Sequence, residues 1–130
     1  MRPNKIFKNK SLLFILVLIL TILIARFLVY IFDPDIVIKG LELHHIYYGV
    51  VLFLLTYILS LVYKKKSLTY LILFAVSIGL IIDELEYILR NFQTIGEYTS
   101  TIPSVIILAL IVSIIILINT KFKRHNIRKE

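Results

Sequence analysis

Long apolar stretches alternate with short polar segments along this chain. Four stretches run from about Ser11 to Phe32, Leu41 to Tyr63, Ser67 to Leu89 and Pro103 to Thr120. A helix needs about 20 mostly apolar residues to cross roughly 30 Å of hydrocarbon. Because backbone polar groups cannot stay unpaired in lipid, and because the stretches are too long for barrel strands, all four should be helices. The pattern predicts one all-α domain over residues 1–130, an antiparallel bundle of four transmembrane helices.

The polar segments predict where these helices end and which of them are neighbours. Asp-Pro-Asp at 33–35 ends the first helix, because proline cannot continue a helix and restricts the residue before it. Three lysines at 64–66 form a turn so short that helices two and three must be antiparallel neighbours. In the polar loop 91–102, Ser100 or Thr101 shortly before Pro103 is typical of a capped helix start. The second helix should begin at either Leu41 or His44.

The basic residues predict the orientation in the membrane. Four precede the first stretch, three join the second and third, and five follow the fourth, which places 12 of the 15 on one side: Arg2, Lys5, Lys8, Lys10, Lys64, Lys65, Lys66, Lys121, Lys123, Arg124, Arg128 and Lys129. Seven of the eight acids lie on or near the other side. Basic residues beside short loops mark the cytoplasmic side, so both termini should be cytoplasmic in a multi-pass protein of the cell membrane.

Composition narrows the class of protein further. Hydrophobic residues make up 59% of the chain, and the formal net charge is +7. A nucleic-acid partner is not expected, because the basic residues form clusters between apolar runs rather than a face of a folded domain. The sequence has no cysteine, which excludes disulfides, thiol nucleophiles, iron–sulfur clusters and other thiolate metal sites. The expected partner is the lipid bilayer.

Charged residues inside the apolar stretches are the main functional signal. At about 1.5 Å per residue, Arg26 lies ~22 Å from the start of its helix and Asp83 ~24 Å from the start of the third. By the same rise, His45 lies ~27 Å from the cytoplasmic end of the second helix. One layer near the outer edge of the hydrocarbon therefore collects Arg26, Glu42, His44, His45, Asp83, Glu84 and Glu86. Charges at such depth are costly, and each is a candidate functional residue.

The spacing of these residues points to a metal site. Glu42 and His45 share one helix face if the second helix begins near Leu41, and Glu-x-x-His is how carboxylate bundles present two ligands to one ion. The candidate ligands are Glu42, His44, His45, Asp83, Glu84 and Glu86. Imidazole with carboxylate suits a divalent Zn, Fe or Mn ion. A haem is not expected, because His44 and His45 are neighbours on one helix and His125 lies at the other side.

Two other interpretations of the same residues stay open. Arg26 could neutralise Asp83 in an intramembrane ion pair that joins the first helix to the third, and the histidines could be interfacial residues beside two tyrosines. A single arginine cannot neutralise three acids in four residues, so the others either bind a cation or carry a proton. Protonated acids would indicate a proton-coupled site rather than a metal site.

Two segments resemble a known group of proteins. Gly40 to Leu55 (GLELHHIYYGVVLFLL) and Phe74 to Asn91 (FAVSIGLIIDELEYILRN) are similar to small, uncharacterised prokaryotic four-helix membrane proteins. That group pairs a His-His-x-x-x-Gly helix start with a later Leu-Asp-Glu, matched here by His44, His45 and Gly49 and then by Asp83 and Glu84. This chain has Ile82 in place of the leucine. The resemblance implies that the two pairs belong together, and it implies no activity.

Three functions compete at this point. The first is a metal-binding membrane protein, which could act as a metal-dependent hydrolase on a lipid or an outer-face substrate. The second is a non-enzymatic assembly subunit that dimerises through small residues such as Ala75 and Gly79, and a homo-oligomer would also complete a di-metal ligand set. The third is a small proton- or ion-coupled transporter. Whether the protein is an enzyme is left open by the sequence.

Overall fold

A computed structural model of the chain describes residues 10–32, 36–38, 41–63, 67–90 and 95–127. Four long helices dominate it: α2 (Lys10–Phe32), α3 (His45–Tyr63), α4 (Leu68–Leu89) and α6 (Ile102–Ile127). Each contains a stretch long and apolar enough to cross a membrane. The expectation of four packed apolar helices is confirmed. Three of them begin within one residue of the predicted start, and α3 begins one residue after His44, the later of its two predicted starts.

The structure corrects the connections. Leu41–Leu43 is not the first turn of α3; it is strand β2, which pairs antiparallel with β1 (Ile36–Ile38) in a two-stranded hairpin. A short helix, α5 (Ile95–Ser100), occupies the segment that was expected to be only a loop. The last helix runs to Ile127, seven residues beyond its predicted end. The predicted junctions at 33–35 and 64–66 lie outside the described residues.

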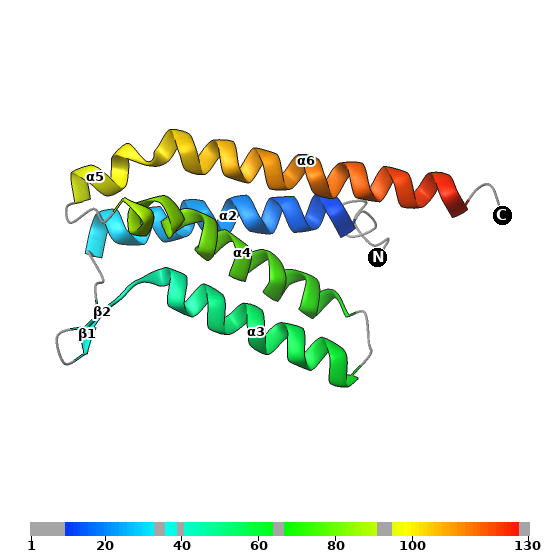
Figure 1. Ribbon diagram of the computed structural model, residues 1–130, viewed down its shortest axis with the longest axis horizontal. Helices are drawn as coiled ribbons and strands as arrows, with labels where there is room; N and C mark the ends of the chain where they lie inside the picture. The colour runs from blue at the N-terminus through cyan, green and yellow to red at the C-terminus, as the bar shows by residue number, and fades with distance from the viewer. Residues whose placement is uncertain (1–9, 33–35, 39–40, 64–66, 91–94, 128–130) are drawn as a thin grey trace, which may run out of the picture.

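Successive long helices run in alternating directions, and α4 lies at the centre of the arrangement (Figure 1). α2, α4 and α6 contact one another, whereas α3 packs along α4 on the side away from α6. The start of α2 and the end of α6 lie at the same end of the bundle. The other end carries the hairpin, α5 and the start of α3, and we call it the hairpin end.

Two glycines explain why α4 approaches both neighbours closely. A Cβ atom on Gly49 of α3 would lie 3.0 Å from the carbonyl oxygen of Ser77 on α4. A Cβ atom on Gly79 of α4 would lie 2.9 Å from the Cβ of Thr21 on α2. Small residues allow the backbones of membrane helices to come together in this way. Glycine therefore sets the α3–α4 and α2–α4 distances.

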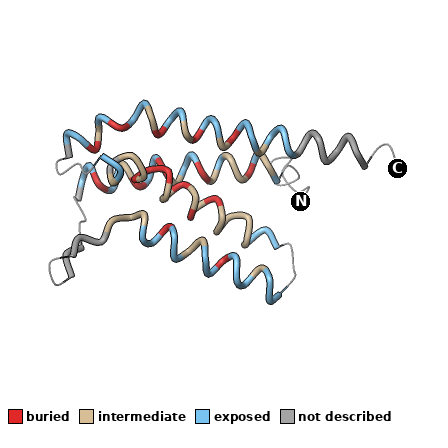
Figure 2. Tube along the Cα trace, in the orientation of Figure 1, coloured by how far each residue is buried: buried red, intermediate tan, exposed pale blue. Residues whose placement is uncertain are grey.

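The core is small and the outer surface is apolar. Six buried residues form the core cluster: Leu18, Ile22, Ala75, Ile82, Val105 and Ala109. Only 11–33% of each candidate span is buried, and Figure 2 shows exposed residues along the outer faces of α3 and α6. Such an extensive apolar exterior is typical of surfaces that contact a membrane or another protein. The arrangement is consistent with a multi-pass membrane protein.

Candidate functional site

Two consecutive acids near the end of α4 organise the hairpin end. Asp83 and Glu84 are 0% and 3% exposed, so both carboxylates are removed from solvent. Consecutive residues of a helix point about 100° apart. Asp83 contacts groups on α2 and α5, and Glu84 contacts the start of α3. The site therefore has two parts, one around each acid.

The first part is an ion pair between α2 and α4. The Arg26 Nε donates a hydrogen bond of 2.7 Å to Asp83 Oδ1, and the Tyr98 hydroxyl donates one of 2.5 Å to Asp83 Oδ2. Arg26 Nη2 donates to the Thr101 hydroxyl at 2.8 Å, and the guanidinium lies 4.7 Å from the centre of the Tyr98 ring. Both carboxylate oxygens are satisfied, and the network joins α2, α4 and the α5–α6 junction.

Tyr98 is suited to remain a donor in this network. Burial of the side chain, together with the neighbouring Asp83 carboxylate, raises the pKa of Tyr98 above its ordinary value. The hydroxyl therefore keeps its proton and donates a hydrogen bond to the Asp83 carboxylate. A buried ion pair that lost one partner would leave an uncompensated charge, which is strongly destabilising. We assign the Arg26–Asp83–Tyr98 network to holding the bundle together.

The second part brings two imidazoles to one carboxylate. His44 Nδ1 lies 2.9 Å from Glu84 Oε1, and His45 Nδ1 lies 3.5 Å from Glu84 Oε2. Both histidine side chains are about one-fifth exposed, at 20% and 19%, so they can be reached from outside the bundle. Three of the six predicted ligands thus come together, His44 from just before α3, His45 from its first residue and Glu84 from α4.

Glu84 also serves the backbone of α3. Its Oε2 accepts a hydrogen bond of 2.7 Å from the backbone N–H of Ile46, in the first turn of that helix. The first N–H groups of a helix have no partner within the helix and need an acceptor. A side chain usually provides this cap from the residue just before the helix. Here the cap comes from another helix, which fixes the carboxylate beside both histidines.

The remaining predicted ligands lie elsewhere. Glu86 is about 200° around α4 from Glu84, and its Oε1 pairs with Arg90 Nη2 at 2.6 Å. Its Oε2 is buried without a hydrogen-bond partner among the described residues. Glu42 lies on strand β2, where its backbone is opposite Val37, and its side chain is outside the described part of the structure. Because α3 begins at His45, the helical Glu42–His45 face that the sequence suggested does not exist.

The described side chains do not form a preformed metal site. Over the residues that the structure describes, no group of three or more histidine, aspartate or glutamate side chains is arranged to hold an ion. In the His44–His45–Glu84 cluster, the imidazoles face the carboxylate oxygens directly. Any ion would have to enter between groups that now contact one another.

Sequence reasoning missed two members of the site. Tyr98 and Thr101 lie in a polar segment that carries no helical periodicity long enough to identify a buried face. Either Ser100 or Thr101 was expected to cap α6. The Thr101 hydroxyl instead donates to the Tyr98 carbonyl oxygen at 2.7 Å and accepts from Arg26, and the Ser100 hydroxyl donates to the Glu97 carbonyl oxygen at 2.6 Å. The one available signal was that two acids and a single arginine in one layer needed further donors.

Comparison with known proteins identifies no relative. No family model, curated protein or solved structure matches the chain.

Proposed function

We propose that this is a multi-pass membrane protein that binds one divalent transition-metal ion at its outer face, through His44, His45 and Glu84. The observation that carries the proposal is the convergence of two imidazole nitrogens on one buried carboxylate, at 2.9 and 3.5 Å. Two ligand atoms bound at about 2.1 Å to one tetrahedral ion lie about 3.4 Å apart. The two observed nitrogen–oxygen separations lie close to that spacing.

The ligand types favour a metal ion of intermediate softness. Imidazole and carboxylate together suit Zn, Fe or Mn, whereas soft ions prefer thiolates, which this chain lacks. The hydrogen bond from the Ile46 N–H to Glu84 would remain and would orient the carboxylate toward the ion, as hydrogen bonds to ligating residues do in other metal sites. A divalent ion would also compensate the buried charge of Glu84.

Three protein ligands favour a reactive site over a purely structural one. Structural zinc sites normally have four protein ligands, and catalytic sites keep a position open for water. An ion held in this way supplies an activated water for hydrolysis. We infer that a substrate would approach from the membrane surface, where the two histidines are partly exposed. Hydrolase activity and the formation of a homo-oligomer stay predictions made from the sequence alone.

The orientation is part of the proposal. In the sequence, three lysines at 64–66 connect α3 to α4. The end of α3 and the start of α4 lie at the end of the bundle opposite the hairpin. Basic residues beside short loops mark the cytoplasmic side. The hairpin end, with the His44–His45–Glu84 cluster, would then face outward, and both termini would be cytoplasmic.

Isothermal titration of the purified, tag-free chain with Zn²⁺ tests the proposal. We expect one ion per chain in the parent, and loss of binding in His45→Ala and Glu84→Gln. Two matched controls should bind normally: Glu86→Gln, a carboxylate on the other side of α4, and His125→Ala, in the last turns of α6. A folded parent that binds no ion would overturn the proposal and leave Glu84 as a cap of α3 alone.

A further inference from the structure

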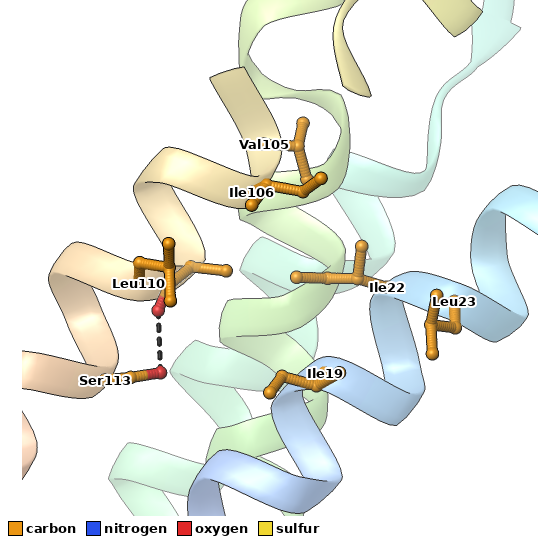
Figure 3. Close-up of a pocket in the computed structure, with 8 residues that line it drawn as sticks. Ile19, Ile22, Leu23, Val105, Ile106, Leu110 and Ser113 are labelled. Atoms are coloured by element: carbon orange, nitrogen blue, oxygen red, sulfur yellow. Dashed lines mark hydrogen bonds between the residues drawn. The ribbon is translucent and has the colours of Figure 1, made fainter. Parts of the chain in front are cut away.

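Two pockets follow one another along the seam between α2 and α6. The first pocket has a volume of about 170 Å³ and is lined by Ile19, Ile22, Leu23, Val105, Ile106, Ala109, Leu110 and Ser113 (Figure 3). Its floor consists of buried residues, among them Ile22, Val105 and Ala109, while Leu23 and Leu110 at its rim are more than half exposed. The pocket is therefore a groove that opens on the membrane-facing surface.

The groove offers no polar group to a ligand. The only polar side chain in its lining, Ser113, donates its hydroxyl to the Ala109 carbonyl oxygen at 2.7 Å (Figure 3). Bound water needs two to four polar partners, and none is available here. The occupant must be apolar.

The second pocket lies one helical turn nearer the hairpin end. It has a volume of about 230 Å³ and is lined by Arg26, Phe27, Val29, Tyr30, Tyr98, Thr99 and Ile102. Phe27 follows Leu23 by one turn of α2, and Ile102 precedes Ile106 by one turn of α6. Unlike the groove, this pocket has an arginine among its lining residues and the exposed Tyr30 side chain at its edge. The seam is therefore apolar in both pockets, and its only charged lining residue lies toward the hairpin end.

We propose that this seam binds one phospholipid, with an acyl chain in the groove and the phosphate beside Arg26 and Tyr30. From Ile19 to Tyr30, α2 rises about 16 Å. That length is about half of the ~30 Å hydrocarbon core, which is the depth of one leaflet. One flexible acyl chain with an anionic head matches the length of the seam, its apolar lining and the arginine at its hairpin end.

Arg26 can contact a phosphate without leaving Asp83. Its Nε and Nη2 are used by Asp83 and Thr101, but within the described residues Nη1 makes one long hydrogen bond of 3.4 Å, to the Tyr98 carbonyl oxygen. A guanidinium group has five N–H donors, so Nη1 retains one for an anionic head. The lipid site and the His44–His45–Glu84 cluster use different residues, so either proposal can fail alone.

Native mass spectrometry of the full chain, transferred from palmitoyl-oleoyl-phosphatidylglycerol vesicles into mild detergent, tests the lipid site. We expect one retained lipid per chain in the parent. Ala109→Leu, which fills the floor, should reduce retention about tenfold by removing buried apolar contact. Ile106→Trp alters only the exposed rim and keeps the test valid if the floor variant does not fold. Val51→Trp, on the exposed face of α3, is the matched control and should retain the lipid.

Three results would overturn the lipid site. Equal retention in the parent and both seam variants would mean lipid bound around the protein without a preferred place. A parent that retains no lipid would mean that the seam holds none. A parent that appears as a dimer, and becomes a monomer in the seam variants, would mean that a second copy covers the groove.

Discussion

Asp83 and Glu84 are adjacent in sequence and equally removed from solvent, but they meet different donors. The Asp83 carboxylate accepts hydrogen bonds from a guanidinium group and a phenol, and neither group loses its proton readily at neutral pH. The Glu84 carboxylate lies beside two imidazoles, which are common metal ligands, and accepts a hydrogen bond from one backbone N–H. The chemistry of the partners therefore favours a structural role for Asp83 and supports the proposed metal-binding role of Glu84.

The Arg26–Asp83 pair predicts a strong effect from a single substitution. Arg26→Met should destabilise the protein by about 3 kcal/mol, because the buried Asp83 carboxylate then loses its cation. The double variant Arg26→Met/Asp83→Asn should recover most of the loss, since no unpaired charge remains. Thermal unfolding in detergent micelles compares the two. A double variant no more stable than Arg26→Met would contradict this role.

Tyr98 predicts a particular dependence of stability on alkaline pH. Its pKa is raised in the folded protein by burial and by Asp83, so the folded state keeps this proton after the same residue in the unfolded chain, with a pKa of about 10, has begun to lose it. The stabilisation is therefore fully present below about pH 10 and declines above it.

Melting temperature measured against pH checks this dependence. Tyr98→Phe should lose about 1 kcal/mol at neutral pH and show a shallower decline in alkali. Tyr30→Phe, a substitution at an exposed position, should follow the parent. Parallel alkaline profiles for Tyr98→Phe and the parent would be inconsistent with a raised pKa.

At the scale of elements, α4 determines the packing because it approaches α2 and α3 through glycines. Gly79→Ala should destabilise the protein by about 2 kcal/mol, since the added methyl group would lie 2.9 Å from Thr21 Cβ and 3.1 Å from the Leu18 carbonyl oxygen. Val51→Ala, on the exposed face of α3, should change stability by less than about 0.5 kcal/mol. Chemical unfolding in micelles measures both. Equal losses of stability in Gly79→Ala and Val51→Ala would show that α2 and α4 can move apart without destabilising the protein.

The four helices could be predicted from sequence because each is a long run of apolar residues. The hairpin could not, because the eight residues from Ile36 to Leu43 are also largely apolar and merge with the start of α3 in any hydropathy pattern. The short α5 could not be predicted because its six residues contain no complete apolar face. Short elements depend on tertiary contacts, here between Tyr98 and Asp83.

The candidate site was predictable in depth but not in pairing. A fixed helical rise places Arg26, Asp83 and His45 in one layer, and the structure has all three at the hairpin end. Rotation about each helix and side-chain direction decide which groups meet, and neither follows from depth. The sequence therefore left six ligands open, of which the structure brings three together.

At the scale of the whole molecule, the apolar exterior and the clusters of basic residues in the sequence predict one orientation in a membrane. The chain has no cysteine, so single cysteines report accessibility directly. In intact cells, a membrane-impermeant maleimide should label Glu97→Cys at the hairpin end and should not label Ser67→Cys at the start of α4, although both positions are exposed. Labelling of Ser67→Cys alone would reverse the orientation and place the histidines in the cytoplasm.

The ligation of a bound ion tests the central proposal most directly. X-ray absorption of the zinc-loaded, tag-free protein should show nitrogen and oxygen ligands at about 2.0–2.1 Å, with the multiple scattering of two imidazoles. His125→Ala should leave that spectrum unchanged, and His44→Ala should remove one imidazole. A spectrum with no imidazole scattering, or one unaffected by His44→Ala, would contradict a metal site formed by His44, His45 and Glu84.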